Sequence, residues 1–223
     1  MDLQITTPML KSFDDVIVQE EFFDKKTIAD LWQEVKQLSK GDDFVDHHGV
    51  FKGQLISCQR FISLDEAGPI LTKVLNKIYD FIDIKISVKE IVYSTLYLPW
   101  DIHCDLIRED STNPFYNVLI PLHDVPSSTI IFNQRSSGYN DFYKYKQSNP
   151  KISDCCSTEF WEEKLSMCWP EDREYLSVKT LLPLQQAGQL IMFKRDLWHS
   201  SDNFHSRTKE PKHFIQLILD RAQ

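Results

Sequence analysis

The sequence predicts a mainly β fold, a barrel or sandwich of short strands supported by helices on one side. Residues 1–83 contain two stretches with apolar side chains at helical spacing. From residue 84 onward the pattern changes to alternation and to short runs rich in β-branched and aromatic residues, which are typical of strands. Helices followed by many short strands favour a helix-supported β structure. A length of 223 residues is ordinary for one such domain.

The N-terminal part, residues 1–83, is expected to supply this helical support. Residues 16–18 predict a short strand, and residues 23–39 place apolar side chains at helical spacing before Gly41, a plausible helix stop. The polar segment 47–49 predicts a loop. A second helix is expected to begin near Pro69, because proline is favoured in the first helical turn.

The barrel is expected to span about residues 84–220, in one domain that covers 1–223. Turn signals that contain proline, glycine or serine separate most of its predicted strands. These strands are expected at 84–88, 90–98, 103–106, 116–122, 129–133, 181–184, 189–193 and 213–219.

The composition changes between residues 134 and 180, where Ser, Tyr, Lys, Asn and acidic residues dominate. We interpret this segment as an insertion between barrel strands, with one short helix at 157–167. Long insertions of this kind often form lids or binding loops. Substrate recognition is therefore expected here.

Composition excludes several classes of protein. A net charge of −8 makes nucleic acid an unlikely main partner, since binding to phosphates needs clustered Lys and Arg. No apolar run approaches the roughly 18 residues of a membrane-spanning helix, and no signal sequence is visible. Five cysteines without a C-x-x-C motif fit a reducing compartment. We therefore expect a cytoplasmic protein.

Three residues have the chemistry of a metal site. His103 and Asp105 are two residues apart, so on a strand both side chains lie on the same face. His199 follows a turn and a buried-looking strand, 189–193. Two imidazoles and one carboxylate are the set that holds non-haem Fe(II) with three positions open. Because roughly 0.7 His-x-Asp pairs are expected by chance in this composition, the pair needs the context that His199 supplies.

A cation opens the last predicted strand. Lys212 lies 13 residues after His199, and a lysine that points into a barrel needs a buried anion. Arg207 is the competing cation, although it lies in the polar loop 200–210. We favour Lys212 because it adjoins the strand.

The order of these motifs resembles the Fe(II)/2-oxoglutarate-dependent dioxygenases, especially prolyl-hydroxylase-like and phytanoyl-CoA-hydroxylase-like members. The resemblance covers roughly residues 88–220. It departs from the family in the insertion and in the cation, because many members carry arginine about ten residues after the last histidine. The ordered motifs are His103-x-Asp105, Asn117-Val118-Leu119-Ile120-Pro121-Leu122, Gly188-x-Leu190-Ile191-x-Phe193, His199 and the cation.

This resemblance implies a double-stranded β-helix, or jelly roll, with supporting helices. It implies Fe(II) as the metal, bound by His103, Asp105 and His199, and 2-oxoglutarate and O2 as co-substrates. It also implies conversion of 2-oxoglutarate to succinate, coupled to hydroxylation of a substrate. Lys212 or Arg207 would bind the distal carboxylate of 2-oxoglutarate. By the same resemblance Tyr97 and Asn117 are candidate contacts to the co-substrate.

Two alternatives stay open at this point. A cupin-type metalloenzyme would use the same ligands without 2-oxoglutarate, and it would need no cation on the last strand. A non-catalytic barrel would act as a binding module without stoichiometric iron. The substrate is expected to be a small molecule or a side chain, and the sequence does not reveal the oligomeric state.

Overall fold

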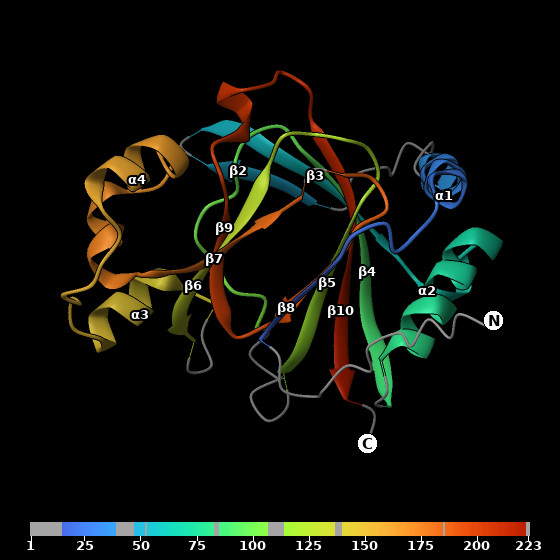
Figure 1. The fold of residues 1–223 in the computed structure, drawn as a ribbon, viewed down its shortest axis with the longest axis horizontal. Helices are drawn as coiled ribbons and strands as arrows, with labels where there is room; N and C mark the ends of the chain where they lie inside the picture. Colours follow the sequence, from blue (N-terminus) through green and yellow to red (C-terminus); the bar gives the residue numbers. More distant parts are fainter. Residues whose placement is uncertain are drawn as a thin grey trace, which may run out of the picture.

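The computed structural model describes residues 15–38, 47–51, 53–82, 85–106, 114–136, 140–184 and 186–221. In this part of the chain two β-sheets form the centre of the molecule (Figure 1). Helices α1 and α2 lie beside one sheet, and helices α3 and α4 lie at the opposite side of the molecule (Figure 1). The predicted mainly β class with supporting helices is confirmed.

The larger sheet has seven strands in the order β1-β8-β5-β10-β4-β3-β2, and every pairing is antiparallel. Its central strand β10 pairs with β4 on one side and β5 on the other. The strands are β1 (Val16–Gln19), β2 (His47–Phe51), β3 (Gln54–Ile62), β4 (Ile86–Leu96), β5 (Pro114–Pro121), β8 (Leu190–Lys194) and β10 (Lys212–Arg221).

The smaller sheet has the order β7-β6-β9. Its strands are β7 (Val178–Pro183), β6 (Ser128–Arg135) and β9 (Leu197–Ser201). A hydrophobic cluster joins the two sheets, with Leu119 and Phe193 from the larger sheet and Ile131 and Leu197 from the smaller one. Facing sheets with a shared core are what the alternation of the strands predicts.

Helices α1 (Lys25–Leu38) and α2 (Pro69–Phe81) pack on the outer face of the larger sheet and form its largest hydrophobic cluster. The carboxylate of Glu34 accepts hydrogen bonds from the backbone of Ile70 and Leu71, at 3.0 and 2.8 Å, and so satisfies the first turn of α2. Gly188 has a φ of 88°, and a Cβ there would lie 2.4 Å from the carbonyl oxygen of Phe23. Glycine is therefore required where the turn before β8 meets the start of the helical layer.

The insertion forms a separate small layer. Helices α3 (Phe142–Ser148) and α4 (Thr158–Lys164), with the 3-10 helix Pro170–Tyr175, pack against the smaller sheet through a cluster that contains Trp161 and Trp198. The short helix expected at 157–167 corresponds to α4.

Two local expectations were wrong, and two strands were missed. Residues 47–49 belong to strand β2 rather than a loop, and β3 and β9 are strands that the sequence pattern did not indicate. The expected strand 103–106 is reduced to a single bridge between His103 and His199. Strands β3 and β9 and the bridge at His103 depend on pairing with segments far away in the sequence, which local patterns do not encode. Strand β2 pairs with its neighbour β3.

Candidate metal centre

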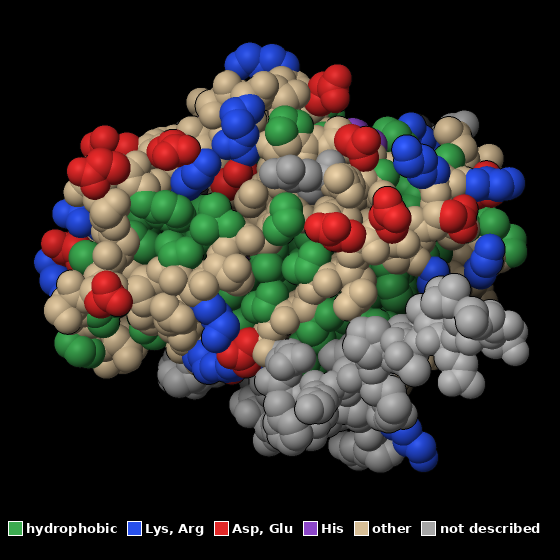
Figure 2. Space-filling model, in the orientation of Figure 1, with side chains coloured by type: hydrophobic (Ala, Val, Ile, Leu, Met, Phe, Trp, Pro, Cys, Tyr) green, Lys and Arg blue, Asp and Glu red, His purple; other side chains and the backbone are tan. Residues whose placement is uncertain are grey.

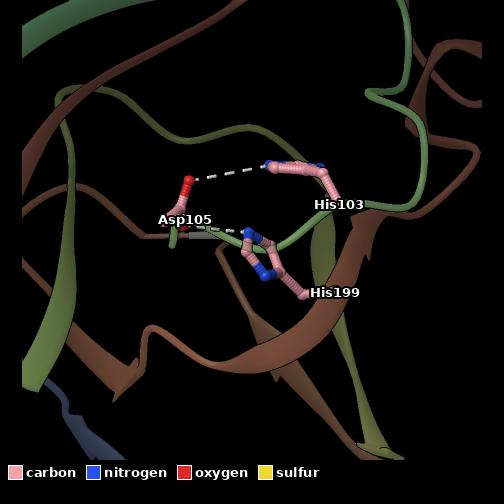
Figure 3. Close-up of side chains that lie close together, drawn as sticks. All are labelled: His103, Asp105 and His199. Carbon is pink, nitrogen blue, oxygen red and sulfur yellow. Dashed lines mark ion pairs between the residues drawn. The ribbon is translucent and has the colours of Figure 1, made fainter. Parts of the chain in front are cut away.

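Three side chains meet at one side of the space between the sheets. His103 lies after β4, Asp105 follows it, and His199 lies in β9 (Figure 3). The Nε2 atoms of His103 and His199 lie 4.0 and 3.2 Å from the oxygens of Asp105. One candidate ligand atom from each residue lies within 4.8 Å of the others. In the part of the chain that is described, this is the one group of three metal-ligating side chains.

Backbone carbonyl groups orient both imidazoles. The Nδ1 atom of His103 lies 2.6 Å from the carbonyl oxygen of Asp101, and that of His199 lies 3.0 Å from the carbonyl oxygen of Leu197. An Nδ1–H that donates to a carbonyl leaves the lone pair on Nε2. Both Nε2 atoms face Asp105 (Figure 3), so the two rings are arranged as metal ligands are.

Two further residues fix Asp105. The side-chain amide of Asn117 donates a hydrogen bond to Oδ2 of the carboxylate. The fully buried guanidinium of Arg195 donates to the backbone oxygen of Asp105 at 3.2 and 2.9 Å, and it pairs with Asp220 at 2.6 Å. Sequence reasoning missed Arg195, since its only signal was a charged residue directly after the buried strand β8.

The charges suit a bound cation. Burial opposes ionisation of Asp105, but attraction and hydrogen bonding to His199, with help from His103 and Arg195, lower its pKa to about 2. Burial, followed by repulsion from His199, lowers the pKa of His103 to about 4. At neutral pH the carboxylate is therefore charged and His103 is neutral, and these are the protonation states that metal binding requires.

The triad opens into a cavity of about 360 Å³ between the sheets. Strands β3, β4, β5, β8 and β10 form one wall, and β6, β9 and Leu184 form the other. Trp100 also lines it, beside His103, with 5.7 Å between the ring centres. Asn140 is the one described residue of the insertion that lines this space.

Lys212 lines the same cavity and is 2% exposed. Its ammonium group lies 5.3 and 5.7 Å from the ring centres of Phe204 and Phe214. Burial lowers the pKa of Lys212 to about 8, although Asp202 opposes the shift. Among the described residues it has no hydrogen bond or ion pair. The near carboxylate of Asp202 is bound by Arg207 through Oδ2, and its Oδ1 is buried without a hydrogen-bond partner in the described chain. A buried ammonium group of this kind needs an anion.

The structure places the other predicted contacts differently. Arg207 lies outside the cavity, where it donates to the carbonyl oxygen of Pro126 at 3.2 and 2.8 Å and pairs with Asp202. Tyr97 is 44% exposed, bonds to Cys58 and does not line the cavity. Asn117 does line it, but its amide is bound to Asp105.

Two hydroxyl groups in the same cavity as Lys212 were not singled out from the sequence. Thr129 of β6 and Ser201 of β9 are register partners, are buried, and line the cavity. Their position on the inner face of the smaller sheet follows from β alternation, but only after β9 is known to be a strand.

No protein-family model and no curated protein matches the sequence. Solved structures do match. The non-haem α-ketoglutarate-dependent epimerase SnoN from nogalamycin biosynthesis is 13% identical over 94% of this chain and 79% of its own, with a TM-score of 0.62. HygX from Streptomyces hygroscopicus, with nickel and 2-oxoglutarate bound, is 10% identical over 93% and 83%, at 0.56. A Pseudomonas putida prolyl-4-hydroxylase is 10% identical over 94% of both chains, at 0.51.

The chain has the double-stranded β-helix fold of the Fe(II)/2-oxoglutarate-dependent enzymes. This confirms the fold that the resemblance implied. The matched structures include an epimerase, a carbocyclase and a hydroxylase. The shared double-stranded β-helix therefore does not identify the reaction.

Proposed function

We propose that this protein is an Fe(II)- and 2-oxoglutarate-dependent oxygenase that hydroxylates a small molecule or a side chain. One observation carries the proposal: the buried ammonium group of Lys212 makes no ion pair or hydrogen bond with a described residue, and it shares a cavity with the metal triad. A dicarboxylate that binds the metal at one end would supply this anion at the other.

The residues fit both groups. His103, Asp105 and His199 would hold Fe(II), since two imidazoles and one carboxylate leave coordination positions open. When bound, Fe(II) and 2-oxoglutarate would activate O2 with release of CO2 and succinate and oxidise a substrate C–H bond. Lys212 would bind the distal carboxylate, and the hydroxyl groups of Thr129 and Ser201 would donate to it.

Other residues would hold the site in place. Asn117 and Arg195 keep the carboxylate of Asp105 and its backbone in position, as partners of metal ligands commonly do. Leu96, Leu119 and Phe193 add apolar surface to the cavity that holds the triad and Lys212, and a bound ligand would displace water there. Exclusion of water strengthens the attraction between Lys212 and a carboxylate.

Hydroxylation is the proposed outcome because Asp105 is present. By the resemblance, related halogenases lack this carboxylate and bind halide in its place. A metalloenzyme that does not use 2-oxoglutarate would have no need for Lys212 in the cavity, and a binding module would have no need for three oriented ligands. Lys212 therefore separates the three functions experimentally.

The cellular compartment and the class of partner are further proposals. All five cysteines are free, which fits the reducing cytoplasm. Lys and Arg side chains are interspersed with acidic ones on the face that Figure 2 shows, so this face offers no continuous basic surface to nucleic acid. No helix in the described segments is long and apolar enough to cross a membrane.

Turnover of 2-oxoglutarate tests the proposal. The protein would be purified without oxygen and supplied with Fe(II), 2-oxoglutarate and ascorbate, and succinate would be followed over time. We expect succinate that depends on Fe(II) and that is lost in Asp105→Ala. Absence of succinate, together with no binding of 2-oxoglutarate to the metal-loaded protein, would favour the cupin-type enzyme or the binding module.

A further inference from the structure

We propose that Glu90 binds a positively charged group of the substrate, an ammonium or guanidinium group, in the part of the cavity farthest from Lys212. This deepens the proposed function, because it names the chemical class of the substrate for the same site. It rests on that function for the reaction, but the binding of a cation can be tested without turnover.

Strand pairing places Glu90 near the metal centre. Asn117 of β5 pairs with Ile218 of β10, and Ile218 pairs with Glu90 of β4. Paired residues of an antiparallel sheet point to the same face, and all three line the cavity. Since neighbouring strands lie about 4.8 Å apart, the Cα atoms of Glu90 and Asn117 are about 10 Å apart. Asn117 contacts Asp105, so a small molecule can reach from Glu90 to the metal.

Glu90 has no partner among the residues that the structure describes. It is half-buried, and its carboxylate makes no hydrogen bond or ion pair with a described residue. Within the described lining of the cavity it is the one acidic side chain apart from Asp105. A partly desolvated carboxylate is stabilised by a cation that comes with the ligand.

Two amide side chains lie on the same wall of the cavity as Glu90. Gln216 lies two residues before Ile218 on β10, and Gln59 lies on β3. The amide nitrogen of Gln59 donates to Ser94 at 3.4 Å, which leaves its carbonyl oxygen as an acceptor. Phe61 and Val92 add apolar surface between these polar groups. This wall thus offers hydrogen-bond acceptors beside an apolar surface, which suits an aliphatic chain that ends in an amine or guanidine.

The opposite charges of Lys212 and Glu90 would direct 2-oxoglutarate and the substrate to different parts of the cavity. Lys212 pairs with Leu96, six residues along β4 from Glu90, so the backbone positions of the two charged residues are roughly 20 Å apart along the strand. A dicarboxylate is attracted to Lys212 and repelled by Glu90, and a cationic substrate has the opposite preference. The cavity therefore disfavours a carboxylate or phosphate on the distal part of the substrate.

Binding of matched probes tests this inference. The protein would be loaded with Mn(II) and 2-oxoglutarate, and the relaxation of ligand protons would report both affinity and closeness to the metal. The probe pairs are n-pentylamine and 1-pentanol, L-arginine and L-citrulline, and L-lysine and Nε-acetyl-L-lysine. The variants are Glu90→Gln, Glu90→Lys and Glu162→Gln, which removes one exposed acid on α4 outside the cavity.

We expect at least one cation to bind about tenfold more tightly than its neutral partner in the wild type and in Glu162→Gln. Its protons should be relaxed by Mn(II). The preference should disappear in Glu90→Gln and reverse in Glu90→Lys. Equal binding within every pair, a preference that survives Glu90→Gln, or no binding of any of the three cations would overturn the inference.

Succinate formation by the wild type and by Glu162→Gln, measured without substrate, separates this inference from the proposed function. Succinate without a preference for cations would leave the function standing and remove the assignment of Glu90. A preference for cations without succinate or 2-oxoglutarate binding would keep the cation site and remove the proposed reaction.

Discussion

Two pairs of histidines lie on opposite faces of the larger sheet, and only one of them has the arrangement of a metal site. His103 and His199 face the cavity, with 4.2 Å between ring centres, and Asp105 lies against both. His123 and His213 pack behind the sheet against Trp32, with 5.1 Å between ring centres.

The difference between the pairs lies in their partners. The Nδ1 atom of His213 contacts the hydroxyl groups of Tyr93 and Thr95, at 3.0 and 3.1 Å, and His123 stacks on Trp32. In the described chain no acidic side chain joins His123 and His213 in a candidate metal group. Closeness of two histidines is therefore not enough: a carboxylate with two Nε2 atoms directed at it makes the difference.

The largest expected effect comes from removing that carboxylate. Asp105→Ala should lower the affinity for Mn(II) or Fe(II) by more than about 100-fold, because loss of a ligand costs more than loss of a residue that orients one. His123→Ala, on the other side of the sheet, should bind metal like the wild type. Metal titration followed by calorimetry measures both, and equal loss in the two variants would contradict the assignment.

Lys212→Met should weaken 2-oxoglutarate binding by about 100-fold or more, since a buried charge pair loses one partner. The same change should stabilise the protein without ligands. The folded-state pKa of Lys212, about 8, lies below the 10.5 of the unfolded chain. The charge therefore costs stability below pH 8, on the order of 3 kcal/mol, and the cost disappears as pH rises towards 10.5.

Denaturant unfolding at pH 7 and pH 10 checks this expectation, with Arg207→Met as the matched control. Arg207 lies outside the cavity and pairs with Asp202, so its loss should leave 2-oxoglutarate affinity within a few-fold. A destabilised Lys212→Met protein at pH 7 would mean that Lys212 has a partner anion without the ligand.

Asn117→Ala should weaken metal binding by about 10- to 100-fold, the usual cost of losing a group that orients a ligand. The hydrogen bond of the Asn117 amide to Asp105 is the reason. A metal affinity equal to that of the wild type would show that His199 and Arg195 alone hold Asp105 in place. The calorimetric titration used for Asp105→Ala applies here without change.

The smallest effect is expected behind the sheet. Burial, then repulsion from His123 and Lys36, lowers the pKa of His213 to about 4. In the unfolded chain His213 binds a proton near pH 6.5. Neutral His213 therefore costs the folded state nothing above pH 6.5, and the free energy of unfolding falls as the pH drops from 6.5 to 4. His213→Asn should remove about 1 to 2 kcal/mol of this loss, allowing for solvent at a half-buried side chain. Unfolding curves at pH 7, 5.5 and 4.5 measure the free energy of unfolding of both proteins. If it falls with pH equally steeply in His213→Asn and in the wild type, this expectation is contradicted.

Much of the fold could be predicted because its elements carry local patterns. The expected helix 23–39 corresponds to α1 (Lys25–Leu38), and the expected strand 116–122 corresponds to β5 (Pro114–Pro121). Strand β3 was missed because its sequence QLISCQRFI mixes polar and apolar residues on both faces. Its pairing with β4 stabilises it, and that pairing is a property of the whole fold.

The candidate site shows the same limit. The order of the motifs allowed His103, Asp105, His199 and Lys212 to be assigned to one site, because their residue types and spacing resemble those of a known family. Glu90 and Arg195 carried no motif. Glu90 faces the cavity only because β4 pairs with β10 in this register, and no local feature of the sequence states that register.

Strand β9 has a consequence for mutational tolerance. All five of its residues are buried, with Trp198 in the core of the insertion and His199 in the cavity. A saturation scan should therefore find no permissive position in β9, whereas β7 of the same sheet exposes every second residue over its first four. The sequence of the strand that carries the last candidate ligand can therefore change only together with both layers that enclose it.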